Sequence, residues 1–302
     1  MDRTRALRSL LFVPGNREEL YPKAAVAGSD TIVLDLEDAV APVGKNLARA
    51  CVAAELARQD RRLTFIRINH PQHGMLAEDL AVLAPHTAQA VMLPKVACLQ
   101  DIEEVDARLA VFEGERELER DSIAMVVVIE TALGLRNLFD IVRRRSRIRG
   151  AALASAEEGD LMFDLGGRWT PGGEALAYAR GKLVCDARAA GIPWVIDGAF
   201  MNLRDSRALE AECRLARNYG FSGKVAIHPR QVPVINDAFS PTAAEIERAR
   251  HLIEDFRQAE TVGRGAIQVR GMMVDAANIR WAERILDLAD AIEAIQRAES
   301  SP

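Results

Sequence analysis

The stretch MVVVIETALG, residues 125–134, decides how the chain folds. Five consecutive apolar residues lead directly into Glu130, and Thr131, a residue type that favours helix N-caps, follows at once. Charged groups are almost never buried without a partner. Glu130 therefore reaches water at the end of a strand, caps a helix, or holds a positively charged group.

Similar runs rich in Val, Ile and Leu recur along the chain, each followed by a helical pattern that in several cases ends in glycine. Runs that are continuously apolar rather than alternating are typical of strands covered on both faces in a parallel sheet. Eight strand–helix units without a break in composition predict a closed (β/α)8 barrel, a TIM barrel. The expected strands are 9–15, 31–38, 63–69, 90–96, 123–131, 150–155, 193–200 and 224–229, and the expected helices are 17–28, 44–59, 75–85, 99–114, 133–145, 172–191 and 206–220.

Residues 1–238 are expected to form this catalytic barrel, which leaves residues 239–302 as an addition. Two amphipathic helical patterns, at 239–258 and 274–296, flank a glycine-rich segment at 262–273. We expect a C-terminal helical extension that serves as a lid or as an oligomer contact.

The composition excludes several classes of protein. With 302 residues, 49% of them hydrophobic and 27% charged, the chain resembles a soluble protein, and its net charge of −5 gives no general attraction to nucleic acid or to an anionic membrane. No apolar segment is long enough to span a bilayer. The basic run RRRSRIRG (143–150) precedes the sixth strand and is interpreted as a solvated helix end at the bottom of the barrel. Four scattered cysteines without a CxxC pair argue against zinc and disulfides and predict a cytoplasmic protein; they are Cys51, Cys98, Cys185 and Cys213.

Polar residues concentrate at the carboxyl ends of the expected strands, which converge on the mouth where barrel enzymes place their chemistry. Glu130 and Asp160, from neighbouring units, offer the oxygen ligands that Mg²⁺ prefers, and this ion usually takes one or two protein carboxylates. Arg67 would offer a planar fork to the carboxylate of a keto acid or to a developing oxyanion. The other polar or turn residues at this edge are Pro14, Gly15, Asp35, Glu37, Asp38, Asn69, Lys95, Asp164, Asp197 and His228.

Simpler interpretations stand beside these. Glu130 is also explained as a solvated strand end, Lys95 as an ion-pair partner, and Asp164 as a turn or cap residue. His228 is also explained as a turn histidine before a proline.

Gly15 is a candidate for anion binding. It lies at the start of the first helix, where backbone N–H groups bind anions.

A series of ordered motifs runs from Arg8 to Trp281 and includes RSLLFVPGN, TIVLDLEDAV, FIRIN, VMLPKV, VVVIETALGLRN, DLMFDLGG, GFSGKVAIHPRQ and MMVDAANIRWA. With these motifs the chain resembles the citrate lyase β-subunit and malyl-CoA lyase family of carbon–carbon lyases. The resemblance implies a (β/α)8 barrel that uses Mg²⁺ and cleaves a 3-hydroxyacyl thioester, usually of CoA, to an acyl-CoA and a 2-oxo acid, reversibly. Malyl-CoA, methylmalyl-CoA and citramalyl-CoA are the substrate types it implies, with a trimeric or hexameric homo-oligomer.

The resemblance also assigns roles to residues. Glu130 and Asp160 would bind magnesium, and Arg67 would contact the acid portion of the substrate. The acidic motif DLED would line the pocket with Asp35, Glu37 and Asp38, and the C-terminal aspartate, which in some family members enters a neighbouring subunit's site, falls on Asp275.

For the expected cleavage we take Glu37, Asp38 or a metal-bound water as the base, and Asp275 as the group that exchanges a proton with the acyl α-carbon. The expected substrate-binding residues are Arg67, Asp35, Lys95 and Gly15.

The chain departs from the family pattern at two places. Gly159 stands where a glutamate usually precedes the metal aspartate, and Ala276 and Ala277 stand where a proline is usual.

Other functions stay open. Condensation followed by thioester hydrolysis would be a malate-synthase-like or thioesterase activity, and a citrate lyase subunit would take its acyl group from a carrier protein. An aldolase of free hydroxy keto acids is a further alternative. A non-catalytic binding barrel is least favoured, because Glu130, Asp160 and Arg67 are all retained.

Overall fold

The computed structural model describes residues 6–58, 63–83, 89–260, 266–269 and 272–300. The chain separates into two compact units, Leu7–Phe239 and Ser240–Pro302, the second of which also includes Ala6. Three expected regions lie partly outside the described residues. They are the C-terminal ends of two expected helices, at Gln59 and at residues 84–85, and parts of the glycine-rich segment 262–273.

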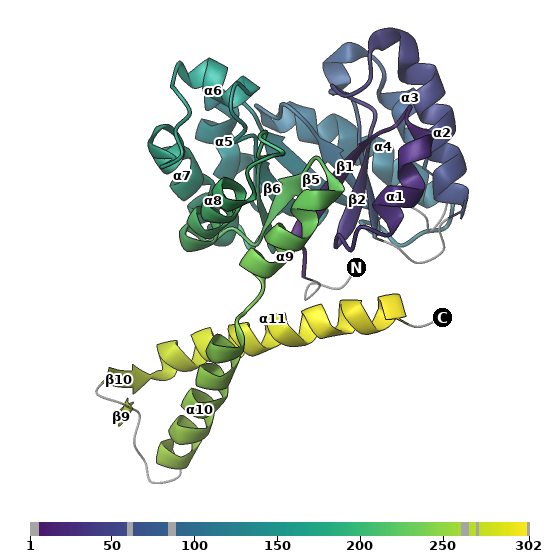
Figure 1. The fold of residues 1–302 in the computed structure, drawn as a ribbon. Helices are drawn as coiled ribbons and strands as arrows, with labels where there is room; N and C mark the ends of the chain where they lie inside the picture. Colours follow the sequence, from purple (N-terminus) through teal and green to yellow (C-terminus); the bar gives the residue numbers. More distant parts are fainter. Residues whose placement is uncertain (1–5, 59–62, 84–88, 261–265, 270–271, 301–302) are drawn as a thin grey trace. The chain divides into compact units, whose positions relative to one another are not determined.

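The first unit is a closed barrel of eight parallel strands in sequence order, as the sequence predicted (Figure 1). The barrel closes where β8 pairs with β1, with Leu10 opposite Val225 and Leu11 opposite Ala226. The strands are β1 (Ser9–Pro14), β2 (Thr31–Asp35), β3 (Thr64–Arg67), β4 (Ala90–Leu93), β5 (Ala124–Ile129), β6 (Ile148–Leu153), β7 (Trp194–Asp197) and β8 (Gly223–Ala226).

Helices surround the strands, and local interactions fix the ends of some of them. The helix after the opening stretch is α5, where the Thr131 side chain accepts the N–H of Gly134 at 3.0 Å as an N-cap. α8 ends at Gly220, whose φ of 104° suits glycine. The helices of this unit are α1 (Tyr21–Ala25), α2 (Lys45–Arg58), α3 (Leu76–Leu80), α4 (Leu99–Glu115), α5 (Ala132–Val142), α6 (Asp160–Leu165), α7 (Ala177–Ala189), α8 (Ser206–Tyr219) and α9 (Val232–Phe239), with 3-10 turns at η1 (Glu18–Leu20), η2 (Pro42–Gly44), η3 (Pro71–His73), η4 (Glu174–Leu176) and η5 (Pro229–Gln231).

Side chains alternate between the barrel interior and the layer under the helices. Val33, Phe65 and Val128 belong to a small inner cluster, whereas their neighbours in sequence pack in the larger cluster that includes the helices. Because the strand period is two, the residue two places beyond each inner residue also points inward, one layer nearer the mouth. Three of the predicted site residues stand at such positions: Asp35, Arg67 and Glu130.

The same alternation removes Asp197 from the mouth. Trp194 and Ile196 are in the inner cluster, so Asp197 points outward beneath the helices and is completely buried. It accepts from Lys224 Nζ at 2.7 Å and from Ser155 Oγ at 2.8 Å. The expectation that Asp197 joins the polar mouth was therefore wrong.

The basic run 143–150 is solvated where it follows α5, since Arg143 and Arg144 are exposed as expected, but Arg147 is not. The Arg147 side chain is 3% exposed and pairs with Glu113 at 2.7 Å, with Asp121 at 3.0 Å and with Asp106. A buried guanidinium requires such partners, because its desolvation is otherwise uncompensated.

The second unit contains the two expected helices and a hairpin that the sequence did not suggest. Its elements are α10 (Ala243–Glu260), β9 (Ala266–Val269), β10 (Met272–Asp275) and α11 (Ala276–Ser300), with β9 and β10 antiparallel. Leu252, Phe256, Val274 and Ala282 form its core. None of the helices in the described part of the chain is long and apolar enough to cross a membrane.

Candidate active site

Arg67 and Asp35 stand opposite each other at the ends of β3 and β2. The guanidinium donates from Nε to Asp35 Oδ1 at 2.7 Å and from Nη2 to Asp35 Oδ2 at 2.6 Å, and Nη1 lies 3.2 Å from Glu37 Oε2. Burial opposes the charge, but the hydrogen bonds and negative charges of Asp35 and Glu37 outweigh it and raise the pKa of Arg67. The Arg67 guanidinium, which was expected to contact the substrate, therefore pairs with Asp35.

Asp35 organises the turn that follows β2. Its Oδ1 also accepts the N–H of Glu37 at 2.9 Å, and its Oδ2 accepts the N–H of Ala39 at 3.2 Å. An aspartate side chain that accepts the backbone N–H groups of the residues following it fixes a tight turn. Both oxygens of this buried carboxylate are used within the protein, and the turn presents Glu37 and Asp38.

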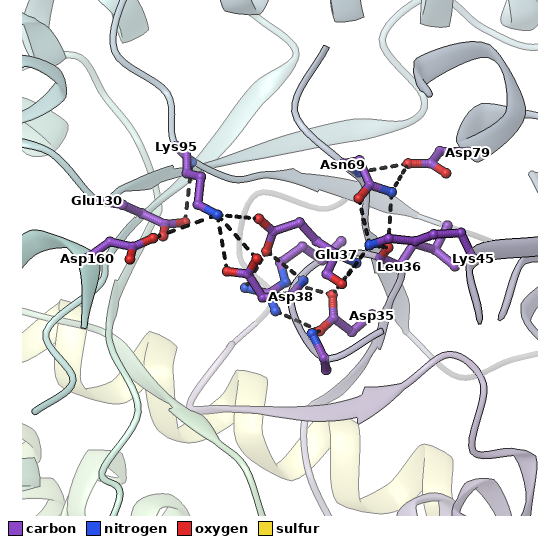
Figure 2. Close-up of polar contacts among 12 residues, drawn as sticks. Asp35, Leu36, Glu37, Asp38, Lys45, Asn69, Asp79, Lys95, Glu130 and Asp160 are labelled. Atoms are coloured by element: carbon purple, nitrogen blue, oxygen red, sulfur yellow. Dashed lines mark hydrogen bonds and ion pairs between the residues drawn. The ribbon is translucent and has the colours of Figure 1, made fainter. Parts of the chain in front are cut away.

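Lys95 connects the acidic residues of the mouth (Figure 2). Its backbone N–H donates to Glu130 Oε1 at 3.3 Å. Its Nζ lies 2.8 Å from Glu37 Oε1, 3.2 Å from both oxygens of Asp38 and 3.7 Å from Asp160 Oδ2. The φ of Lys95 is 54°, a left-handed conformation that costs energy outside glycine and is concentrated at functional sites. That conformation lets one residue direct both its N–H and its ammonium group at carboxylates.

Glu130 is a buried carboxylate with an unusual proton affinity. Its residue is 5% exposed, and burial, followed by the negative charge of Glu37, raises the pKa of Glu130 to about 7. Asp160 is the first residue of α6 and its side chain is 57% exposed. The structure therefore brings both predicted metal ligands to Lys95, one buried and one open to solvent.

This donor set fits a hard divalent cation. Glu130 is buried beside Glu37, and a nearby positive ion would relieve both its desolvation and this repulsion. Within the residues that the structure describes, no three His, Cys, Asp or Glu side chains are grouped to hold a metal ion. Two carboxylates are nevertheless sufficient for Mg²⁺, which keeps its remaining positions for water and substrate.

Glu37 and Asp38 are neighbours with opposite pKa displacements. Burial raises the pKa of Glu37 above its ordinary value. Burial acts in the same direction on Asp38, but its interactions with the Glu37 side chain and the Lys95 ammonium outweigh it and lower the pKa of Asp38. Adjacent carboxyl groups with separated proton affinities are the arrangement that acid–base chemistry uses.

Gly15 has a steric role. Its N–H donates to the Asp35 carbonyl at 2.8 Å, and a Cβ at this position would lie 2.7 Å from that same oxygen. The N–H group that was expected to bind an anion is thus used within the protein, and α1 is a helix of five residues.

The simpler interpretations of two residues are confirmed. Asp164 Oδ2 accepts the N–H of Ala132 at 2.6 Å, at the start of α5. His228 caps η5, where its Nδ1 accepts the N–H of Arg230 at 3.1 Å.

Asp275 belongs to the second unit, at the junction of β10 and α11. Its Oδ1 accepts the N–H of Ala277 at 2.8 Å, so the carboxylate caps α11. Its role in catalysis stays a prediction.

Three polar residues behind the mouth were not assigned a function from the sequence: Lys45, Asn69 and Asp79. The last two are buried, with 2% and 0% exposure, and Lys45 donates to Asn69 Oδ1 at 2.8 Å. We call these three residues the support network. An aspartate within the apolar pattern of LAEDL (76–80) was the available signal for Asp79.

Comparison with known proteins identifies the family of this barrel. Residues 8–229 match the sequence model of the HpcH/HpaI aldolase/citrate lyase family, and residues 185–292 match a model described as a C–C bond lyase of the TIM-barrel fold. The chain belongs to the HpcH/HpaI aldolase/citrate lyase family. The resemblance drawn from the motifs is thereby confirmed.

Relatives within this family are similar over nearly their whole length. The citrate lyase subunit beta of Leuconostoc mesenteroides subsp. cremoris is 34% identical, with 96% of each chain covered. A (3S)-malyl-CoA thioesterase of Cereibacter sphaeroides is also 34% identical, again over 96% of each chain. The mitochondrial citramalyl-CoA lyase of Rattus norvegicus is 32% identical, over 95% of this chain and 87% of the relative.

A solved structure gives the fold comparison. CitE from Mycobacterium tuberculosis, in complex with magnesium, acetoacetate and coenzyme A, has a TM-score of 0.76 and 29% sequence identity. The match covers 95% of this chain and 99% of that one.

Proposed function

We propose that this protein is a Mg²⁺-dependent carbon–carbon lyase that cleaves a 3-hydroxyacyl-CoA thioester, reversibly, to an acyl-CoA and a 2-oxo acid. Malyl-CoA, methylmalyl-CoA and citramalyl-CoA are the substrate types. The observation that carries the proposal is the placement of Glu130 and Asp160 around Lys95 at the mouth of a family barrel. The named activities of the relatives, and the magnesium and coenzyme A in CitE, support it.

Glu130 and Asp160 would hold the metal ion. When bound, Mg²⁺ supplies a Lewis acid that polarises substrate oxygen atoms and lowers the pKa of a coordinated hydroxyl.

Arg67 and Lys95 supply the fixed positive charge of the site. Arg67 is held rigidly by Asp35 at the end of a strand, and its guanidinium would stabilise oxygen charge that develops during cleavage. One preorganised donor of this kind contributes about 2.7 to 4 kcal/mol to lowering an activation barrier. Lys95 would pair with a carboxylate or enolate oxygen of the substrate. Asp35 and Gly15 are given positioning roles, in place of the substrate contacts expected from the sequence.

Glu37 and Asp38 are the candidate bases for the substrate hydroxyl. Loss of that proton allows the bond between the β-carbon and the α-carbon to break, with the bonding electrons passing to the thioester enolate. A proton then returns to the α-carbon, for which Asp275 is the proposed donor. Glu37 is the better candidate base, because its raised pKa lies nearer the working pH of an enzyme.

The test is incubation with Mg²⁺ and a panel of malyl-, citramalyl- and citryl-thioesters, with identification of the 2-oxo acid released. Glu130→Ala and Asp160→Ala should abolish cleavage and leave the fold intact. Asp164→Asn is the matched control on the same helix as Asp160, because its carbonyl oxygen still accepts the N–H of Ala132. Wild-type turnover that persists in excess EDTA would contradict the metal role.

Thioester hydrolysis is a second candidate function, favoured by the similarity to (3S)-malyl-CoA thioesterase. Hydrolysis needs an additional carboxylate to activate water, which Asp38 or Asp275 would provide. Release of free CoA thiol distinguishes hydrolysis from cleavage, which leaves the thioester intact. The citrate lyase relative raises the further alternative of an acyl-carrier substrate, for which thioesters of a carrier protein are the test.

We also propose that the protein works in the cytoplasm as a trimeric or hexameric homo-oligomer. Light scattering of the purified chain measures the assembly. The proposed lid or oligomer contact of the second unit is tested by truncation after Phe239.

A further inference from the structure

We propose that the support network, Lys45, Asn69 and Asp79, positions Glu37 and Asp38 for proton transfer from behind the active site. The inference rests on the proposed lyase function, which assigns those two carboxylates to the chemistry. The three residues act through the backbone of the turn after β2, so they are positioning residues.

Lys45 contributes the central contacts. Its Nζ donates to the carbonyl of Leu36 at 2.6 Å, to the carbonyl of Glu37 at 2.8 Å and to Asn69 Oδ1 at 2.8 Å (Figure 2). An ammonium group has three N–H donors, so these contacts use all of them. Lys45 therefore ties two consecutive carbonyl groups of the turn to one point.

Asn69 and Asp79 hold Lys45 in place. Asn69 Nδ2 donates to the Leu36 carbonyl at 3.0 Å and to Asp79 Oδ2 at 2.7 Å, which leaves Oδ1 for the ammonium. Rotation of the amide would turn its NH₂ group toward Lys45 and its oxygen toward the carboxylate, so this orientation is fixed. Asp79 is completely buried, and it also accepts the Asn69 N–H at 2.7 Å.

A second cation on α2 anchors the far end of the network. Arg49 Nε donates to Asp79 Oδ1 at 2.8 Å. Arg49 follows Lys45 by four residues, which places both cations on one face of the helix. Helix α2, the segment after β3 and helix α3 are therefore joined through polar side chains.

The geometry of the turn shows why these contacts orient Glu37 and Asp38. The peptide group between Leu36 and Glu37 is held at its carbonyl by Lys45 and Asn69, and at its N–H by Asp35. The next peptide group is held at its carbonyl by Lys45 and by the Val40 N–H at 2.9 Å, and its N–H donates to Glu37 Oε2 at 3.0 Å. Both peptide planes are thus fixed at both ends. Lys45 is the side chain that contacts the two carbonyls together.

The test compares Lys45→Met and Asp79→Asn with Asp30→Asn. Asp30 is the matched control, because it is a buried carboxylate that pairs with Arg8 at 2.7 Å just before β2, at the end of that strand away from the mouth. We expect Lys45→Met to lower kcat by about 100-fold, the cost of a displacement of about 1 Å at reacting groups, with KM nearly unchanged. Asp79→Asn should lower kcat by about 10-fold. Asp30→Asn should lower thermal stability without changing kcat.

Two further measurements separate positioning from stability and from the identity of the reaction. Added propylammonium should restore part of the activity of Lys45→Ala, and the isosteric alcohol should not. Hydrogen exchange of the amides of residues 37–39 should speed up by about tenfold or more in Lys45→Met, and should be unchanged in Asp30→Asn.

The outcomes are distinguishable. Unchanged kcat and unchanged amide exchange in Lys45→Met would overturn the positioning role, even if the wild-type protein is an active lyase. If the wild-type protein cleaves no thioester while exchange in the turn still increases in Lys45→Met, the lyase proposal fails and the structural role of the network stands.

Discussion

Replacing Glu130 with glutamine isolates the charge on which the proposed metal site depends. Glutamine has nearly the same shape and keeps an oxygen that accepts the Lys95 N–H, which is 3.3 Å from Glu130 Oε1. The substitution removes the ionisable group. Any difference between the two proteins that varies with pH therefore reports the ionisation of Glu130.

The direction of the effect follows from the pKa. Burial, and then the charge of Glu37, raises the pKa of Glu130 from 4.5 to about 7 on folding. A carboxyl group with a raised pKa contributes its stabilisation fully below its unfolded pKa, and this contribution is lost as the pH rises through the folded pKa. A displacement from 4.5 to about 7 corresponds to about 3 kcal/mol in the free energy of unfolding. In metal-free conditions, wild type should therefore lose about 3 kcal/mol relative to Glu130→Gln between pH 4.5 and pH 8.

The assay is urea unfolding with EDTA at several pH values, followed by tryptophan fluorescence. A second series adds Mg²⁺ in place of EDTA at pH 8. A ligand at 100 times its Kd stabilises the folded state by about 2.7 kcal/mol, so Mg²⁺ should recover most of the loss in wild type and much less in Glu130→Gln. A stability difference that does not change with pH would refute the raised pKa, and equal stabilisation of both proteins by Mg²⁺ would refute the metal role of Glu130.

Substitutions at three other positions test separate parts of the structure. Lys95→Gly and Lys95→Ala both remove the shared ammonium group and should lower kcat by about 100-fold or more. Because glycine tolerates the φ of 54°, Lys95→Gly should be about 1 kcal/mol more stable than Lys95→Ala in urea unfolding. Asp197→Asn leaves Lys224 and Arg180 with fewer buried partners and should lower the free energy of unfolding by about 3 to 5 kcal/mol, with kcat unchanged in an assay below the unfolding temperature. Gly15→Ala places a Cβ 2.7 Å from the Asp35 carbonyl and should cost about 1 to 3 kcal/mol, measured by the same unfolding assay.

The barrel was predictable because its signal is repeated. Each strand is a short apolar run, and several helices begin or end at a recognisable residue, such as the Thr131 N-cap or Gly220 after α8. Eight repetitions of a weak local signal, combined with the rule that parallel strands need crossover helices, leave few alternative topologies. The hairpin of β9 and β10 had no such repetition and lay within a glycine-rich segment.

The direction in which a strand-end residue points was harder to predict. Both faces of a barrel strand are apolar, so the sequence shows the strand without showing which residues face inward. Asp35 and Asp197 both end a strand in a similar pattern, TIVLD and WVID, yet one points to the mouth and the other lies under the helices. The register of each strand in the closed barrel decides between them, and a single sequence does not contain that register.

The support network was harder still to predict, because its members are joined only by tertiary structure. Lys45 and Arg49 lie on one helix, Asn69 follows a strand and Asp79 lies in a helix of five residues. Lys45 and Arg49 each resemble ordinary surface residues in the sequence, and the apolar pattern around Asp79 does not identify its partners. In the folded protein they converge on two backbone carbonyl groups. Every residue has a backbone carbonyl, so the sequence does not show which of these groups a side chain will contact. The residues that touch substrate can be recognised by their chemical type, whereas the residues that fix their backbone are identified from the folded structure, where Lys45 contacts the carbonyls of Leu36 and Glu37 together.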